Sequence, residues 1–122
     1  MAGTVTTTET THTSVKQIKF VWTSSAGGAA DATTTAAFDG RVIYAAQIPD
    51  GGGTQPTNAY DVTVTDANGV DVLKGLGADL SNAANTYKAD SDGLGAVSGS
   101  TLTLAVTNAG ASKGGKTILY IR

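Results

Sequence analysis

The feature that most constrains the fold is a period-two alternation of apolar and polar residues in short segments. In the segment 15–22, Ile18, Phe20 and Trp22 fall on one face, and Gln17 and Lys19 fall on the other. No segment longer than about two helical turns carries apolar residues at helical spacing. The pattern therefore predicts an all-β chain.

The alternation recurs often enough to predict about eight short strands in one antiparallel β-sandwich or jelly-roll-like domain. The segment 41–48 has two largely apolar faces and is expected at the centre of a sheet. Further strands are predicted at 29–37, 60–65, 70–73, 84–89, 102–106 and 116–122.

The connections between these segments are rich in glycine and aspartate. Asp66-Ala67-Asn68-Gly69 predicts a hairpin that joins 60–65 to 70–73. The polar stretch 108–115 predicts a second, longer hairpin that joins 102–106 to 116–122. Three successive glycines and Pro56 predict an exposed loop at 50–57. Turns are also predicted at 24–28, 38–40 and 90–93.

The first 13 residues differ from the rest, because nearly all of them are small or polar. They predict a flexible or partner-ordered arm at 1–13, followed by the β-sandwich domain at 14–122. Such an arm can add a strand to the edge of a neighbouring sheet. The candidate docking residues within it are Thr4, Val5, Thr6, Thr7 and Thr8.

Composition narrows the possible partners. The net charge of −2 is spread along 122 residues without a basic run, which disfavours nucleic acid and membrane surfaces. Cysteine is absent, and the polar N-terminal segment does not resemble a secretory signal. Leu, Ile, Val and Phe make up only about a fifth of the chain, so the core is thin. We therefore expect self-association or docking to supply further stability.

The chain shows no recognisable catalytic constellation, and we expect neither an enzyme nor a cofactor. The single histidine, His12, lies in the predicted arm. The aspartates at 39, 50, 66, 90 and 92 fall at predicted turns, where Asp is favoured, although two carboxylates can still meet in the fold. Asp66, Asn68 and Asp71 resemble the start of a calcium loop but lack its final glutamate. The glycines at 51–53, 75 and 77 lack the lysine and helix start of a phosphate cradle.

The aromatic residues have two interpretations. Trp22, Tyr44, Tyr60 and Tyr120 each lie on an alternating strand face, which favours a place in the core. The alternative is a sugar-stacking surface.

Three segments carry a resemblance to a known group of proteins: 14–24, 48–62, and the ending made of 102–110 with 119–122. They resemble small virion proteins of tailed bacteriophages. The resemblance implies a capsid decoration, or cement, protein that binds the outside of the major capsid protein shell and stabilises it. It also implies a place in the virion, assembled in the host cytoplasm. The alternative is a tail or head-fibre component that binds carbohydrate or a receptor through the loops at 50–57 and 108–115.

Overall fold

The computed structural model describes residues 3–122, which form nine strands and two short 3-10 turns. No helix within residues 3–122 is long and apolar enough to cross a membrane. The elements are β1 (Thr4–His12), β2 (Val15–Thr23), β3 (Ala30–Thr33), β4 (Phe38–Pro49), η1 (Gly52–Thr54), β5 (Asp61–Thr65), β6 (Thr86–Ala89), η2 (Asp90–Asp92), β7 (Ala96–Ser100), β8 (Thr103–Thr107) and β9 (Gly114–Ile121).

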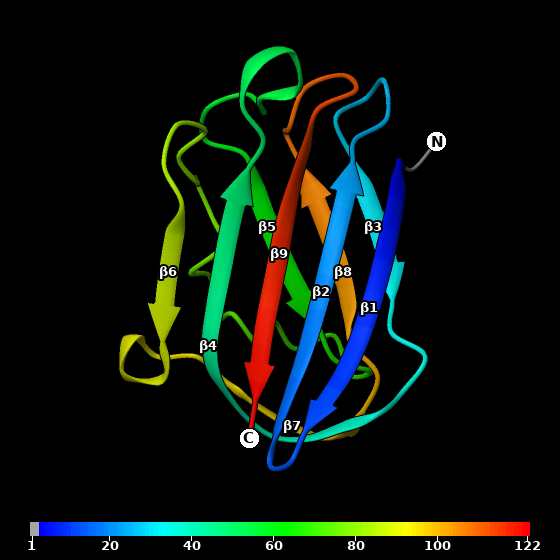
Figure 1. The fold of residues 1–122 in the computed structure, drawn as a ribbon, viewed down its shortest axis with the longest axis vertical. Coiled ribbons are helices and arrows are strands. Elements are labelled where there is room, and N and C mark those ends of the chain that lie inside the picture. Colours follow the sequence, from blue (N-terminus) through cyan, green and yellow to red (C-terminus); the bar gives the residue numbers. More distant parts are fainter. Residues whose placement is uncertain (1–2) are drawn as a thin grey trace.

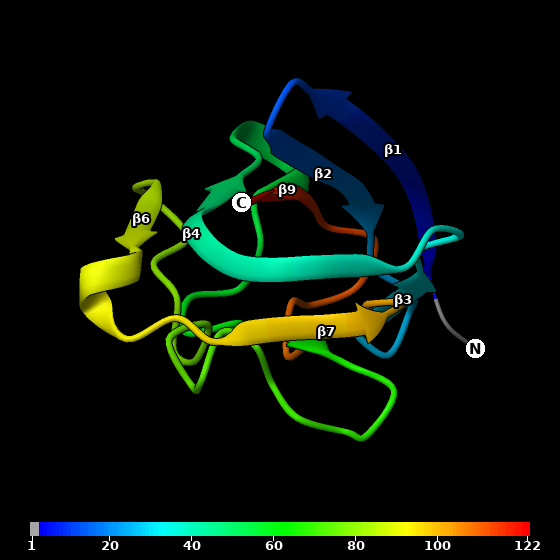
Figure 2. The same ribbon diagram turned by 90° about the horizontal axis from the view of Figure 1, so that it is seen from below.

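The strands form two antiparallel sheets packed face to face (Figures 1 and 2). The larger sheet has the order β1-β2-β9-β4-β6, with β7 paired to the beginning of β4. The smaller sheet has the order β3-β8-β5. From β2 to β6, and again from β7 to β9, each strand lies in the opposite sheet from the one before it, as in a jelly roll. The prediction of an all-β, sandwich-like fold is confirmed.

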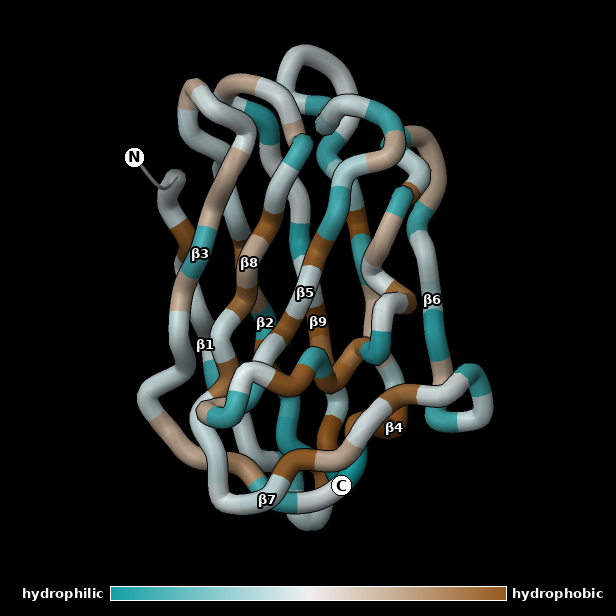
Figure 3. Tube along the Cα trace, turned by 180° about the vertical axis from the view of Figure 1, so that it is seen from behind, coloured by the Kyte–Doolittle hydropathy of each residue, from teal (hydrophilic) through white to brown (hydrophobic). Residues whose placement is uncertain are grey.

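The core lies between the sheets, where apolar residues from alternate strand positions meet. Ile18, Phe20 and Trp22 of β2 are buried, as the alternation predicted. Leu104 and Val106 of β8 approach them from the smaller sheet. In Figure 3, apolar and polar residues alternate along the strands of the smaller sheet. Small side chains such as Ala30, Ala45 and Ala109 complete a continuous core.

Five predicted strands are confirmed with small shifts at their ends: β2, β4, β5, β8 and β9. The predicted strands at 29–37 and 84–89 are shorter, because only β3 (Ala30–Thr33) and β6 (Thr86–Ala89) pair regularly. Strand β7 was missed, since its residues are mostly small and, among its apolar side chains, only Val97 is buried.

Both predicted hairpins need correction. The segment 70–73 returns after the turn at 66–69, but it forms only a single bridge between Thr65 and Asp71 and is no strand. β8 and β9 are not paired, because the stretch between them crosses from the smaller sheet to the larger one. Both strands bury alternate residues against the same core, so their alternation could not indicate which sheet each joins.

The predicted turn at 38–40 is also wrong, since these residues begin β4. The pairing of β4 with β7 shifts register between Phe38 and Gly40, and its pairing with β9 shifts between Val42 and Tyr44. A register shift of this kind adds a residue on one strand and reverses the facing of the residues beyond it. As a result, Val42 and Ala45 are both buried, and Tyr44 turns outward.

The predicted arm at 1–13 is corrected for the residues from Thr4 to His12, which form strand β1 of the domain itself. This strand pairs with β2 without interruption, from Thr4 opposite Thr23 to His12 opposite Val15. The physical reason is that threonine is well suited to strands, and that Val5 packs against the core. Met1 and Ala2 lie outside the described residues.

Candidate docking surface

The predicted docking residues lie on β1, the edge strand of the larger sheet (Figure 1). Thr4, Thr6 and Thr8 are exposed, and Val5 and Thr7 are half-buried. The structure thus brings all five residues together on one strand, with threonine side chains on its outer face. Their backbone pairs with β2 on one side only.

Hydrogen bonds connect the chain to neighbouring segments just before β1, at Gly3, and within β1, at Glu9. The Gly3 amide donates to the Ala29 carbonyl at 2.9 Å. The Glu9 carboxylate accepts hydrogen bonds from the backbone N–H groups of Thr35 and Ala36 at 3.0 and 2.9 Å, and from the Thr35 hydroxyl at 3.0 Å. Partial burial tends to raise the pKa of Glu9, but these three hydrogen bonds together outweigh it and leave the pKa below its ordinary value.

Between Gly3 and Glu9, the backbone of Thr4–Thr8 is hydrogen-bonded, in the described part of the chain, only on the side that faces β2. Within residues 3–122, this backbone forms no hydrogen bond outside the β1–β2 ladder. In an antiparallel edge strand, alternate residues direct both their N–H and C=O groups away from the sheet. Thr4–Thr8 therefore presents unpaired backbone groups to a partner.

The remaining sheet edges are shorter or carry charge. β6 and β3 each have four residues, and they include Lys88 and Asp31 respectively. β5 has five residues and begins with Asp61. β7 has five residues and no charge. Natural proteins protect sheet edges from unwanted pairing by short strands, charges, proline or bulges. The nine-residue strand β1 is the longest edge, and its one carboxylate, Glu9, lies beyond the stretch Thr4–Thr8, which has no charge, proline or bulge.

The aromatic residues divide between the core and the surface. Trp22 and Tyr60 are buried, as predicted, and burial raises the pKa of Tyr60 to about 12. The prediction of a core position is wrong for Tyr44, which is 37% exposed, and for Tyr120, which lies outside the core. Tyr120 is half-buried on the same outer face as Tyr44, directly opposite it across β9 and β4.

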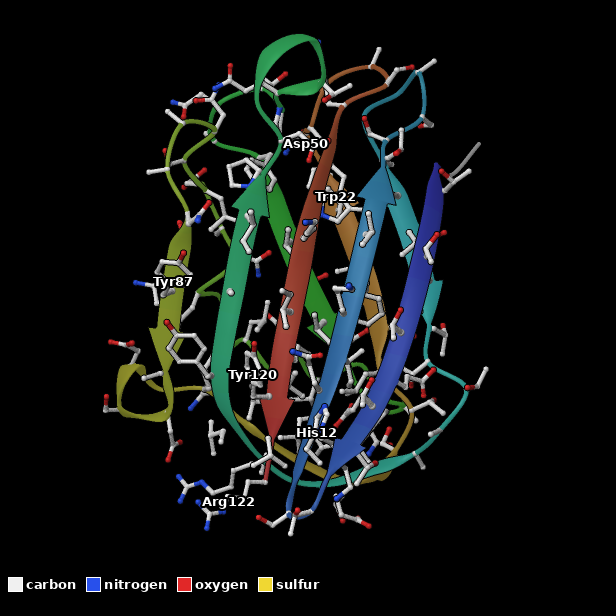
Figure 4. All side chains as sticks on the ribbon, in the orientation of Figure 1. His12, Trp22, Asp50, Tyr87, Tyr120 and Arg122 are labelled. Carbon is white, nitrogen blue, oxygen red and sulfur yellow. The ribbon has the colours of Figure 1, made fainter. Side chains whose placement is uncertain are left out.

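A further aromatic residue, Tyr87 of β6, was not singled out in the sequence and is 52% exposed. Figure 4 looks onto the outer face of the larger sheet and shows Tyr87 and Tyr120 there. The ring centroid of Tyr44 lies 6.1 Å from that of Tyr87 and 5.9 Å from that of Tyr120. The sequence contains one signal for this surface. The segment 41–48 has two largely apolar faces, and only one of them can face the core of a two-sheet sandwich.

The aspartates that resembled a calcium loop are used by the backbone instead. Asp66 Oδ1 accepts from the N–H groups of Asn68 and Val70, both at 2.9 Å. Asp71 accepts from three backbone N–H groups, those of residues 64, 73 and 75. Within the described part of the chain, no group of three or more acidic or histidine side chains is placed to hold a metal ion.

The other candidates for chemistry are also explained by local structure. His12 is exposed at the end of β1. Asp92 accepts from the Ala89 amide at 2.7 Å and closes the turn at η2. Asp39 lies inside β4 instead of in a turn, and it accepts from the Gly99 amide of β7.

The two loops that were considered as a binding rim meet at one end of the sandwich. The Lys113 ammonium donates to the Gly53 carbonyl at 3.1 Å, and the Thr57 amide donates to the Ala109 carbonyl at 2.9 Å. Neither loop contains an aromatic residue. They can supply backbone and hydroxyl groups to a ligand, but no ring for stacking.

The surface has two hollows, one of which adjoins the beginning of β1. One, of about 280 Å³, is lined by Gly3, Thr4 and residues 23–27. Its Ser24 hydroxyl donates to the Gly110 carbonyl at 2.5 Å and accepts from the Lys113 amide at 2.8 Å, so it fastens the crossover before β9. The other, of about 410 Å³, lies between residues 75–81 and β6.

Comparison of the chain with protein-family models, with curated proteins and with solved structures gives no match. The functional argument therefore depends on the residues and their geometry.

Proposed function

We propose that the protein is a structural protein of a tailed-bacteriophage virion, which binds in many copies to the outside of the major capsid protein shell and stabilises it. The observation that carries the docking part of this proposal is the open edge at Thr4–Thr8. An exposed strand of this kind accepts a partner strand through backbone hydrogen bonds. The phage assignment is supported by the resemblance of 14–24, 48–62 and the C-terminal segments.

The few backbone hydrogen bonds that Thr4–Thr8 can form favour binding of many copies to a lattice over tight binding of a single copy. A short strand contributes a few backbone hydrogen bonds, each worth about 0.5–1.5 kcal/mol net. On a lattice with many identical sites, linked or self-associated copies gain avidity without any new contact. Jelly rolls occur in viral capsid proteins as well as in lectins, so the fold agrees with this role without selecting it.

The test is binding to capsids assembled from the major capsid protein of the same phage and purified without this protein. We expect saturable binding at a fixed ratio to the shell subunits, and a higher temperature of shell disruption when the sites are filled. Absence of the protein from mature particles would overturn the proposal.

Two lysine variants locate the docking surface. Thr6→Lys places a charge beside the open edge, and lysine is a common natural protection of such edges. Thr63→Lys is the matched control, because Thr63 is also an exposed strand threonine but lies on β5 of the smaller sheet. Thr6→Lys should weaken shell binding at least about tenfold, the factor expected for loss of one to two hydrogen bonds. Equal binding by both variants would exclude the β1 edge as the docking surface.

A further inference from the structure

The three tyrosines on the outer face of the larger sheet form a nearly continuous aromatic surface. The rings of Tyr44 and Tyr87 are close to parallel, at 17°, with centroids 6.1 Å apart. Aromatic pairs with centroids about 4.5–7 Å apart are in contact, but part of each ring remains open to solvent. The exposed fractions of 37% for Tyr44 and 52% for Tyr87 agree with this. Tyr120 extends the surface across β9, tilted by 54° from Tyr44.

Polar groups at the margin of this surface are held in fixed positions. The side-chain amide of Gln17 donates to the Tyr120 hydroxyl at 3.2 Å, and that of Asn85 donates to the Tyr87 hydroxyl at 2.8 Å. Because each phenol oxygen accepts one of these bonds, its own O–H remains a donor for a ligand. The amide oxygens of Gln17 and Asn85 have no hydrogen-bond donor within residues 3–122, so they remain acceptors.

The charged residues near the three tyrosines indicate which net charge a ligand can carry. The outward positions of β2, β9 and β6 carry no carboxylate, and their cations are Lys19 and Lys116. On β4, the exposed Arg41 forms an ion pair with Asp90 at 3.2 Å, so these two charges offset each other beside Tyr44, and the exposed Asp39 lies near the beginning of the strand. Lys19 lies opposite Ile118, and Lys116 lies opposite Ile48, away from the row that joins Tyr120 to Tyr44. A nucleic acid needs several cations along its phosphates, and the tyrosine surface does not provide them.

A neutral ligand with an apolar face and a rim of hydroxyl groups matches these features. We propose that Tyr44, Tyr87 and Tyr120, with Gln17 and Asn85, form a binding platform for a neutral oligosaccharide. The C–H face of a sugar ring would stack on the tyrosines, and its hydroxyl groups would exchange hydrogen bonds with the phenols and amides. The platform lies on strands, not on the aromatic-free loops at 50–57 and 108–115.

The shape of the site favours an extended chain over a single sugar. Pockets for small molecules enclose about 70–90% of the ligand surface, whereas this platform can cover only one side of it. Binding of a monosaccharide is therefore expected to be weak, and an oligosaccharide that covers more than one tyrosine is expected to bind more tightly. The platform residue nearest to β1 is Gln17, which pairs with Thr10 and not with the stretch Thr4–Thr8, so both surfaces can be occupied together. The platform does not depend on the proposed docking to a shell.

The experiment is a titration of the ¹⁵N-labelled full chain with cellohexaose, maltohexaose and hexa-N-acetylchitohexaose, followed by NMR. With at least one of them, we expect saturable shifts confined to Gln17, Tyr44, Asn85, Tyr87, Tyr120 and their neighbours. Tyr87→Ala should weaken the affinity at least about fivefold, because an aromatic contact of this size is lost. Tyr87→Phe should lose less, because it keeps the ring.

Val21→Ala is the matched control, since Val21 is also exposed on this sheet, at 38%, but lies opposite Lys116. It should bind like the unchanged protein. Emission from the buried Trp22 verifies that each variant is folded. The proposal is overturned if none of the three oligosaccharides causes shifts, or if binding survives both Tyr44→Ala and Tyr87→Ala. It is also overturned if dilution without sugar shifts the platform residues, because a second copy then covers them.

Discussion

The rings of Trp22 and Tyr60 pack with their centroids 5.7 Å apart and their planes at 49°, and they join the two sheets near one end of the sandwich. Trp22 belongs to β2 of the larger sheet, and Tyr60 immediately precedes β5 of the smaller sheet. Both are 1% exposed. This contact makes the only tryptophan of the chain a reporter of sheet packing.

Tyr60 should make stability fall at alkaline pH. Burial raises its pKa to about 12 in the folded protein, against 10.0 ordinarily. The unfolded chain therefore loses the phenol proton first, and the stabilisation that is complete below about pH 10 is lost as the pH rises towards 12. We expect a loss of about 2–3 kcal/mol across this range. Urea unfolding followed by Trp22 emission should show it in the unchanged protein and show much less of it in Tyr60→Phe. An equal alkaline loss in both proteins would contradict this assignment.

Glu9 should contribute stability that depends on its ionisation. Its pKa is lowered in the folded protein, so its contribution is present above its ordinary pKa of 4.5 and is lost as the pH falls through the lowered value. Glu9→Ala removes the acceptor of three hydrogen bonds and should cost about 1–3 kcal/mol at neutral pH. The difference between the two proteins in urea unfolding should shrink on acidification. A difference that stays constant down to about pH 2 would mean that packing, not the carboxylate charge, accounts for it.

Asp71 should be important for folding of the segment after β5. Its carboxylate binds the N–H groups of Val64, Leu73 and Gly75 at 3.0–3.2 Å. Asp71→Ala leaves these donors without their partner and should cost about 2–4 kcal/mol in urea unfolding. Asp31→Ala is the control, because Asp31 is exposed and should change stability by less than about 0.5 kcal/mol. Similar values for the two variants would refute this role.

Gly77 should tolerate no side chain. A Cβ atom there would overlap the Val62 carbonyl oxygen, and the Gly77 carbonyl accepts the Val62 amide at 2.7 Å. Gly77→Ala must therefore displace backbone next to β5, and we expect it to lower the free energy of unfolding by about 1–3 kcal/mol. Gly53→Ala has open space around the new methyl group and serves as the control. If both variants unfold at the same urea concentration, the close approach at Gly77 is not rigid.

Strand alternation predicted the fold class and five strands, because burial between two sheets imposes a period of two wherever large apolar residues are present. It failed where that signal was missing or misleading. β1 contains one apolar residue, Val5, and its place in the sheet is fixed by pairing with β2. The register shift after Val42 turned Tyr44 outward, and alternation alone could not indicate it. The pairing of β9 with β2 and β4, rather than with β8, depends on the whole topology.

The candidate surfaces were predictable to different degrees. The sequence predicted Thr4–Thr8 as docking residues and placed them in an arm, whereas the structure places them in the edge strand β1. The tyrosine platform required three strands to be brought side by side, and one of its members, Tyr87, gave no distinctive pattern. Surfaces assembled across strands depend on register, which short strands with small side chains specify weakly.

The most direct test of the account is a cryo-electron microscopy map of the shell with the protein bound. The account predicts that a strand of the shell protein lies beside Thr4–Thr8 and continues the larger sheet beyond β1. A map in which β1 faces solvent and another surface contacts the shell would contradict it.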